Sequence, residues 1–520
     1  MSELEGFLGL VLAAVILAAA ARRAGAPYPV FLAIGGALLA FLPGEPTFSV
    51  PPDLALALFV APILLDAAYD ASPRDLRDNW IPVTGLVVVA VGLTTAAVAV
   101  VARALMPEIP WPAAVALGAV VAPPDAAAAT AVLRPLRPPH RILTILEGES
   151  LLNDATALLV YRLAVGAAAG AFSFGAIAPT FLLGVAGSLV LGPALGWLFL
   201  RLIARVEDVP TAIILQFVTT LGVWVLAERV GVSAVLTVVC YAIMVARTAP
   251  ERTPARLRIP SYAVWETVVF LLNILAFSFI GLQLRPILEA LDPAARGRYF
   301  GVAAAVLVTV IVVRPAWHMS FNAVIRWRDR RVGFNPPRPM LRPTVGSGLL
   351  ISWAGMRGIV TVAAALALPP AFPFRDLIVL TAFAVVLGTL IIQGLTLKPL
   401  LQALDLKDGD PVGRELGEAR ARALRAGLAV LDREQSPLGD AVRQEFTAHL
   451  AAADAQTDGG RPRRSAHGTI HRRAVQAARD AVLAMRGTDE IGDDAFHRIE
   501  EELDWLEMAD GGKLGADADA

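Results

Sequence analysis

Charged residues are scarce in this sequence. Asp, Glu, Lys and Arg make up 18% of the 520 residues, hydrophobic residues make up 56%, and the mean hydropathy is +0.62. Soluble globular chains carry about 25% charged residues and lack successive apolar windows of about 20 residues. The scarcity of charge therefore argues against a soluble protein and indicates a chain of membrane-crossing helices.

The sequence also has only one cysteine, no excess of basic residues and no pattern typical of a cleavable leader. Cys240 is the single cysteine, so no intrachain disulfide can form, and the net charge of −1 gives no basic footprint for nucleic acid. Neither cysteines nor histidines cluster as transition-metal ligands, and no cofactor is expected. The acidic start (MSELEG) lacks the basic region of a signal peptide, so the first apolar run is expected to stay as a transmembrane helix.

Apolar windows bounded by Pro, Gly and charged residues predict an all-α polytopic membrane protein with about thirteen spans. The predicted spans are 5–21, 28–43, 53–70, 80–105, 111–133, 143–168, 174–204, 210–228, 231–247, 260–284, 299–325, 346–370 and 376–402. Arginines concentrate in the odd-numbered links, as at Arg134, Arg137 and Arg141. Because basic residues collect on the cytoplasmic side, the N-terminus is predicted outside and the C-terminal tail in the cytoplasm.

The composition changes from Leu406 onward, where the chain becomes charged and rich in alanine. This change predicts two domains, a transmembrane domain over 1–402 and a cytosolic, mostly helical regulatory tail over 403–520. Helical runs are expected at 415–434, 473–485 and 496–506, with a break at 459–464 and disorder from 511 to 520.

A few charges lie inside the predicted spans, where a charge is costly and usually functional. They are Asp66, Asp125, Glu147, Glu149, Asp154, Glu266, Arg314 and Arg357. In the sixth span, Ser150 and Asp154 are four residues apart and share one helix face, and so do Glu149 and Asn153. Glu147 falls toward the cytoplasmic entrance, where capping or snorkelling is an equal alternative to a functional role.

Two spans carry signals for a broken helix. In the fifth, Pro123 and Pro124 remove two backbone donors just before Asp125, which then lies near the positive end of a second half-helix. In the twelfth, Gly355 and Gly358 bracket Arg357 and permit a similar break, although glycine also serves close helix packing. The breaks lie seven spans apart, which predicts two inverted six-helix repeats around a transport site at the membrane centre.

These motifs resemble a known family. Glu-Gly-Glu-Ser-Leu-Leu-Asn-Asp-Ala-Thr-Ala-Leu (147–158), the Asp125 segment and Gly-Met-Arg-Gly-Ile-Val (355–360) are similar to the sodium/proton exchanger domain of the first monovalent cation:proton antiporter family, in its bacterial NhaP-like branch. The resemblance covers about 1–402. It implies thirteen spans, inverted repeats with crossed broken helices, a homodimer and elevator-like alternating access.

The resemblance also implies roles for single residues. Asp154 matches the ion-binding aspartate, Asn153 the asparagine before it, Asp125 the aspartate of the broken helix, and Ser150 a serine that helps coordinate the cation. The resemblance further implies that Glu149 pairs with Arg357, while Asp66 stands where the family often has glutamate. One departure is clear: the family's Thr-Asp-Pro is Pro124-Asp125-Ala126 here, so a threonine ligand is lost.

The predicted chemistry is exchange of Na⁺ or Li⁺ for H⁺ across the inner membrane. Hard monovalent cations take oxygen ligands, so Asp154 and Ser150 are the expected metal ligands. Asp154 can hold a proton or a cation but not both, and Asn153 cannot titrate, so electroneutral exchange is expected. A K⁺/H⁺ antiporter with the same residues is the alternative. A channel would need a continuous selectivity filter, and none is evident. A hydrolase would need a nucleophile beside a base; this is not evident either, so no enzyme is expected.

Overall fold

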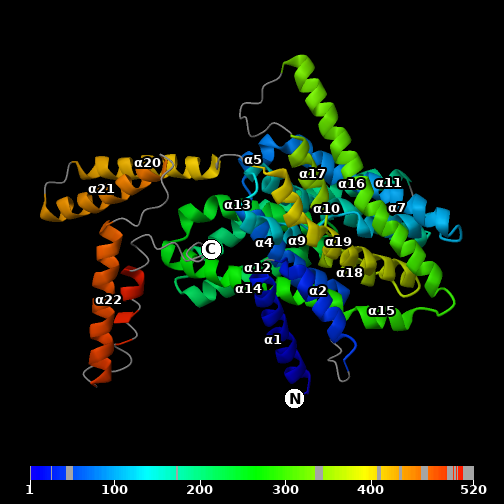
Figure 1. The fold of residues 1–520 in the computed structure, drawn as a ribbon, viewed down its shortest axis with the longest axis horizontal. Coiled ribbons are helices and arrows are strands. Elements are labelled where there is room, and N and C mark those ends of the chain that lie inside the picture. Colours follow the sequence, from blue (N-terminus) through cyan, green and yellow to red (C-terminus); the bar gives the residue numbers. More distant parts are fainter. Residues whose placement is uncertain are drawn as a thin grey trace. The chain divides into compact units, whose positions relative to one another are not determined.

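The computed structural model describes residues 2–24, 26–42, 51–170, 174–333, 344–406, 411–432, 436–457, 466–488, 496, 499–500 and 502–506. Every regular element in these residues is a helix, in agreement with the predicted all-α class. Contacts divide the chain into two units, Met1–Asp408 and Gly409–Ala520, whose helices are drawn in Figure 1.

The first unit is built from helices of very unequal length. They are α1 (Ser2–Arg23), α2 (Tyr28–Leu39), α3 (Pro52–Ala55), the π-helix η1 (Leu56–Val60), α4 (Ala61–Asp70), α5 (Pro73–Asp78), α6 (Trp80–Thr84), the π-helix η2 (Gly85–Ala90), α7 (Val91–Leu105), α8 (Trp111–Val121), α9 (Ala126–Leu133), the 3₁₀ turn η3 (Arg134–Leu136), α10 (His140–Ala168), α11 (Phe174–Ile203), α12 (Val209–Val230), α13 (Ala234–Arg252), α14 (Ala255–Leu282), α15 (Leu284–Ala290), α16 (Arg296–Val332), α17 (Val345–Trp353), α18 (Ile359–Leu366) and α19 (Arg375–Leu404).

Nine helical segments in the described residues are long and apolar enough to cross a membrane. They are Glu5–Arg23, Trp80–Leu105, Trp111–Leu136, His140–Ala168, Leu182–Ile203, Val209–Val230, Ala255–Ala290, Arg296–Val332 and Arg375–Leu404. The remaining predicted spans fall on shorter or interrupted helices: α2, α3 with η1 and α4, α13, and α17 with α18. The thirteen-span count therefore stays a prediction.

Packing in this unit suits a bilayer. Aliphatic side chains such as Leu12 on α1, Val190 on α11 and Ile214 on α12 are exposed, as helices that face hydrocarbon require. Inside, α2 and α14 cross at Gly36 and Gly281 so closely that a Cβ atom at Gly36 would lie 2.3 Å from the Ser278 carbonyl oxygen. Small residues thus let backbones approach, as is common between membrane helices.

The second unit contains α20 (Pro411–Leu431), α21 (Pro437–Thr457) and α22 (Ala466–Gly487). Gly427 of α20 lies against the ring of Phe446 in α21, and α22 buries Val475 and Val482 in a cluster with Phe496 and Leu503. The predicted runs 415–434 and 473–485 fall on α20 and α22, whereas α21 was not predicted. The expected break at 459–464 and the tail end 511–520 lie outside the described residues.

Candidate functional site

The predicted break in the fifth span is present between α8 and α9. Residues 122–125 connect the two short helices, and Pro123 and Pro124 cannot donate the hydrogen bonds that would continue α8. Asp125 is the N-cap of α9, and its Oδ1 accepts a hydrogen bond from the Ala127 backbone N–H at 2.8 Å. A carboxylate is thereby fixed at the positive end of a half-helix.

A second break separates α17 from α18 and contacts the first. Residues 354–358 form no regular helix, and the carbonyl oxygen of Met356 accepts from the Asp125 backbone N–H at 2.7 Å. Gly358 lies directly against the Asp125 carboxylate, because a Cβ atom at this position would fall 1.7 Å from Oδ2. Two irregular backbone segments, far apart in sequence, therefore meet at one buried point.

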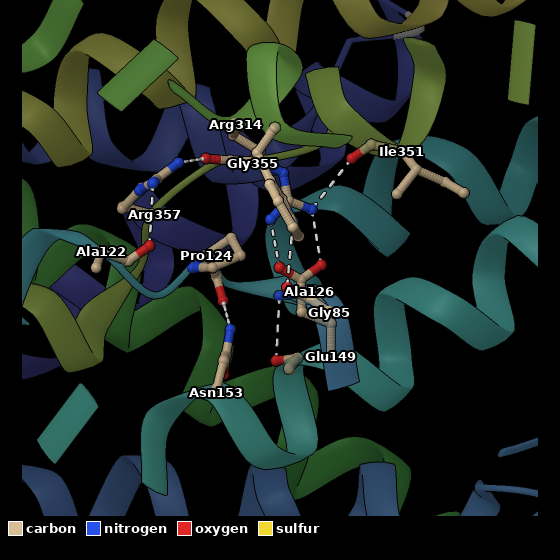
Figure 2. Close-up of polar contacts among 12 residues, drawn as sticks. Gly85, Ala122, Pro124, Ala126, Glu149, Asn153, Arg314, Ile351, Gly355 and Arg357 are labelled. Atoms are coloured by element: carbon tan, nitrogen blue, oxygen red, sulfur yellow. Dashed lines mark hydrogen bonds and ion pairs between the residues drawn. The ribbon is translucent and has the colours of Figure 1, made fainter. Parts of the chain in front are cut away.

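Arg357 joins the two breaks through backbone carbonyls. Its Nε donates to the Val121 carbonyl and its Nη2 to the Ala122 carbonyl, both at 3.0 Å, and its Nη1 donates to Gly355 (Figure 2). The end of α8 leaves carbonyl oxygens without helical partners, and a buried guanidinium supplies the missing donors. Arg357 thus holds the broken segments together, but by a different partner set from the one expected.

The expected ion pair between Glu149 and Arg357 is wrong. Glu149 pairs instead with Arg314 of α16: both carboxylate oxygens accept from the two terminal nitrogens, with 2.7 Å between Oε2 and Nη2 (Figure 2). Arg314 also donates to the Ile351 carbonyl of α17 at 3.1 Å. The reason is geometric, since a planar guanidinium can bind a carboxylate with two parallel bonds, while the Arg357 donors are occupied by carbonyls. The sequence did mark Arg314 as a charge within an apolar run, but gave it no partner.

The sixth-span residues converge on the first break. Asn153 is fully buried and donates from Nδ2 to the Pro124 carbonyl at 2.8 Å, while Ser150 Oγ accepts from the Ala126 backbone N–H at 3.3 Å. Asp154 is 7% exposed, and its carboxylate accepts no hydrogen bond from the residues that the structure describes. A buried carboxylate without a donor is suited to bind a proton or a cation.

Two cavities that share lining residues reach these groups. A small pocket of about 50 Å³ is lined by Asp125, Ser150 and Asp154, and a larger, open cavity of about 830 Å³ shares Asp125 and Ser150. Asp66 of α4 and Glu147 of α10 line the larger cavity but not the small pocket. The structure therefore places these two carboxylates in the larger cavity, outside the small pocket that contains Asp154.

Glu147 has a partner in this cavity, because its Oε1 accepts from Arg134 Nη2 at 3.0 Å. Glu266 of α14 and Asp70 of α4 add further carboxylates to the lining. The cavity wall thus carries five carboxylates against three guanidinium groups, from Arg22, Arg134 and Arg258. This excess of acidic groups favours cations over anions in the cavity.

The cytoplasmic-side start predicted for α10 is anchored by Asp75 of α5. Its Oδ2 lies 3.1 Å from His140 Nε2, and its Oδ1 accepts from Arg74 Nε at 3.2 Å. Burial raises the pKa of Asp75, but the hydrogen bonds from His140 and Arg74 outweigh it and hold that pKa below its usual range. The ionised carboxylate therefore fixes the end of the helix that carries Asp154.

No group of three or more His, Cys, Asp or Glu side chains with metal-binding spacing occurs among the described residues.

The sequence model described as "Sodium/hydrogen exchanger, transmembrane" matches residues 10–403. The chain belongs to the sodium/hydrogen exchanger family. Members of this family are transporters that cross the membrane several times, and this fits the nine long apolar helices in the part of the chain that the structure describes.

Similar proteins carry names of the same kind. An uncharacterised Na⁺/H⁺ exchanger of Mycobacterium bovis is 29% identical, over 96% of this chain and 95% of that protein. A sodium, potassium, lithium and rubidium/H⁺ antiporter of Bacillus pumilus is 31% identical, over 78% of this chain and 62% of that protein. The sodium proton antiporter MjNhaP1 of Methanocaldococcus jannaschii has the same fold, with a TM-score of 0.59 at 17% identity over 78% of this chain and 99% of that one.

Proposed function

We propose that this exchanger moves Na⁺ or Li⁺ against H⁺, with Asp154 as the group that both ions share. The observation that carries the proposal is the small pocket at the crossing of the two breaks, where Asp154, Asp125 and Ser150 converge. Carboxylate and hydroxyl oxygens are the ligands that hard cations prefer. A proton on Asp154 removes the charge that would hold the cation, so occupancy by the two ions is mutually exclusive.

Access to the pocket supports an inward-facing state. The larger cavity extends from Ser150 and Asp125 to Arg134, next to Arg137 in a link whose arginines predict a cytoplasmic position. We infer that the conformation with this open cavity loads and releases ions on the cytoplasmic side. Alternating access then requires an outward-facing state in which this cavity closes, by elevator-like movement of the broken helices.

Electroneutral exchange of one cation per proton is part of the proposal. Asp125 is held at the N-terminus of α9, Glu149 is paired with Arg314, and Asn153 cannot titrate. Asp154 is then the group that alternates. K⁺/H⁺ exchange at the same site is the second candidate, and the Bacillus antiporter named for sodium, potassium, lithium and rubidium favours testing it.

The proposal extends to assembly and placement. We infer a homodimer in the cell's inner membrane, with thirteen spans arranged as inverted repeats, the N-terminus outside and the second unit, Gly409–Ala520, as a cytosolic regulatory tail. A role in pH homeostasis follows from proton-coupled cation exchange. Support for the topology comes from the two breaks seven predicted spans apart and from the arginine distribution.

The test is cation-driven proton movement in sealed vesicles that contain the purified protein. Na⁺, Li⁺ or K⁺ added to vesicles with an acidic lumen should dequench a pH dye, and the order of the three half-saturating concentrations gives the preference. Asp154→Asn should abolish the response. Asp376→Asn, an exposed aspartate at the start of α19, is the matched control and should exchange normally. Sodium-driven dequenching that persists in Asp154→Asn would overturn the shared-site proposal.

A further inference from the structure

Asn273 of α14 borders both cavities of the site. Its side chain is 9% exposed, and it lines the small pocket together with Asp154 as well as the larger cavity. The Asn273 Nδ2 donates to the Val269 carbonyl at 3.0 Å. Because a carbonyl oxygen can only accept, this bond fixes the amide orientation and leaves Oδ1 as the group available to the cavities.

Thr361 of α18 lines the same small pocket and is 1% exposed. Buried threonines in helices usually donate to a carbonyl one turn earlier, as Thr389 of α19 does to Val385 at 2.7 Å. The Thr361 hydroxyl makes no such bond to any residue that the structure describes. A buried hydroxyl without a protein partner at the edge of a pocket is free to bind what the pocket contains.

The size of the pocket brings these oxygens near one ion. Its volume of about 50 Å³ is comparable to the space of one or two water molecules, so it admits only a small occupant. Pro124 offers no side-chain oxygen to this pocket, and its carbonyl is bound by Asn153. The pocket's side-chain oxygens therefore come from two carboxylates, Ser150, and the two neutral groups on α14 and α18.

We propose that Asn273 Oδ1 and Thr361 Oγ1 are neutral ligands of the transported monovalent cation, and that they take the place of the threonine ligand lost at Pro124. This inference rests on the proposed function and deepens it. Both groups are uncharged, so they strengthen cation binding without adding a second titrating site. Asn273 lines the larger cavity as well as the small pocket, as Asp125 and Ser150 do.

The experiment measures the KM for Na⁺ and the maximal rate in vesicles for Asn273→Ala and Thr361→Val. Loss of a neutral oxygen ligand should raise the KM for Na⁺ by about tenfold or more, because polar contacts to a charged group are worth that much in affinity. The maximal rate and the pH profile at saturating Na⁺ should change less than about twofold. A rise in the KM for Na⁺ without a fall in the maximal rate distinguishes a cation ligand from a residue that only supports the fold.

Matched controls come from buried residues of the same type elsewhere. Asn322→Ala removes a buried asparagine of α16, and Thr381→Val a buried threonine of α19; neither residue lines a cavity of the site, and both variants should keep the wild-type KM. Asn273→Ser guards against misfolding, since a serine hydroxyl can still donate to Val269 while it no longer reaches the pocket. Its KM should rise like that of Asn273→Ala.

The outcomes separate this inference from the proposed function. If wild-type protein exchanges Na⁺, Asp154→Asn is inactive, and Asn273→Ser and Thr361→Val keep a wild-type KM, the two neutral ligands are overturned and the shared site stands. If Asp154→Asn still exchanges Na⁺, the proposed function itself fails. Sodium-induced thermal stabilisation of detergent-purified protein gives a second readout, which should need about tenfold more Na⁺ in Asn273→Ser.

Discussion

Glu149 and Arg314 form a bidentate ion pair between α10 and α16, with 2.7 Å between Oε2 and Nη2 and with side chains that are 1% and 3% exposed. Glu149 lies on the helix that also carries Asp154, and Arg314 lies on α16, so the pair fixes α10 against α16. Removing one partner would leave a buried charge without compensation. We therefore expect Glu149 to control the stability of the protein and not ion binding.

Neutralising one member of this pair should be costly. Glu149→Gln or Arg314→Gln is expected to lower the free energy of unfolding by about 3–5 kcal/mol, and the double variant by clearly less than the sum. Denaturant unfolding in detergent measures all three. Glu147→Gln, which breaks the more exposed pair with Arg134, should cost about 1 kcal/mol or less. Additive losses in the Glu149/Arg314 double variant would show that the two residues are not coupled.

A second double-mutant cycle, with Arg357, tests which arginine is coupled to Glu149. Its donors go to Val121, Ala122 and Gly355, so Glu149→Gln and Arg357→Gln should show less coupling than Glu149→Gln and Arg314→Gln. A larger coupling energy for the Arg357 cycle would restore the ion pair that the family resemblance implied.

Gly358 is expected to tolerate no side chain. A Cβ atom would lie 1.7 Å from Asp125 Oδ2, so Gly358→Ala must displace either the carboxylate or the break between α17 and α18. Vesicle exchange should fall at least about tenfold, since a displacement of about 1 Å at a reacting group costs up to a hundredfold. Gly92→Ala on α7, where no atom lies within 4 Å of the added Cβ, is the control and should exchange at the wild-type rate.

The sequence was most informative at residues that are unusual in an apolar membrane helix. Charges within apolar runs marked Asp125, Asp154 and Glu149, and two adjacent prolines located the break before α9, because both features conflict with an ordinary membrane helix. The sequence could not predict which arginine pairs with Glu149. Whether Glu149 contacts Arg314 or Arg357 depends on how three helices are rotated about their axes. The carbonyl ends of α8 were, however, a usable signal, since a proline break leaves acceptors that a buried arginine can satisfy.

Uncharged site residues were missed for a different reason. Asn273 sits in a helix with several other polar side chains, and Thr361 is a single uncharged polar residue in the apolar helix α18. Only the lining of the pocket distinguishes them. In the second unit, α21 was missed because its charged, alanine-rich sequence has no apolar stripe as clear as those of α20 and α22.

The second unit should be dispensable for exchange itself. Contacts divide the chain after Asp408, and the residues proposed to bind ions all lie before this point. A chain that ends at Lys407 is expected to insert, to purify as the same oligomer as the full chain, and to exchange with an altered rate or pH profile. Size-exclusion chromatography and vesicle assays between pH 6 and 9 test this. An inserted, correctly assembled truncation without exchange at any pH would contradict the regulatory assignment.

Exchange should be insensitive to membrane potential. Glu149 is paired with Arg314, Asn153 carries no charge, and Asp125 is bound at the N-terminus of α9, which leaves Asp154 as the group that alternates. With one proton traded for one monovalent cation, the carrier has the same net charge on both crossings. A potential does work of about 2.3 kcal/mol per charge per 100 mV, and here the net charge moved is zero.

The measurement is the exchange rate under an imposed potassium-diffusion potential, with Na⁺ or Li⁺ as the driving cation so that K⁺ sets only the voltage. Equal rates at zero potential and at either sign are expected, together with no transient current on a supported membrane. A clear voltage dependence would mean that a second proton travels. Asp125 is then its carrier, because it is the other carboxylate that lines the small pocket, and Asp125→Asn should remove the voltage dependence if any transport survives. Glu149→Gln should leave it in place, since that charge is held by Arg314 on both crossings.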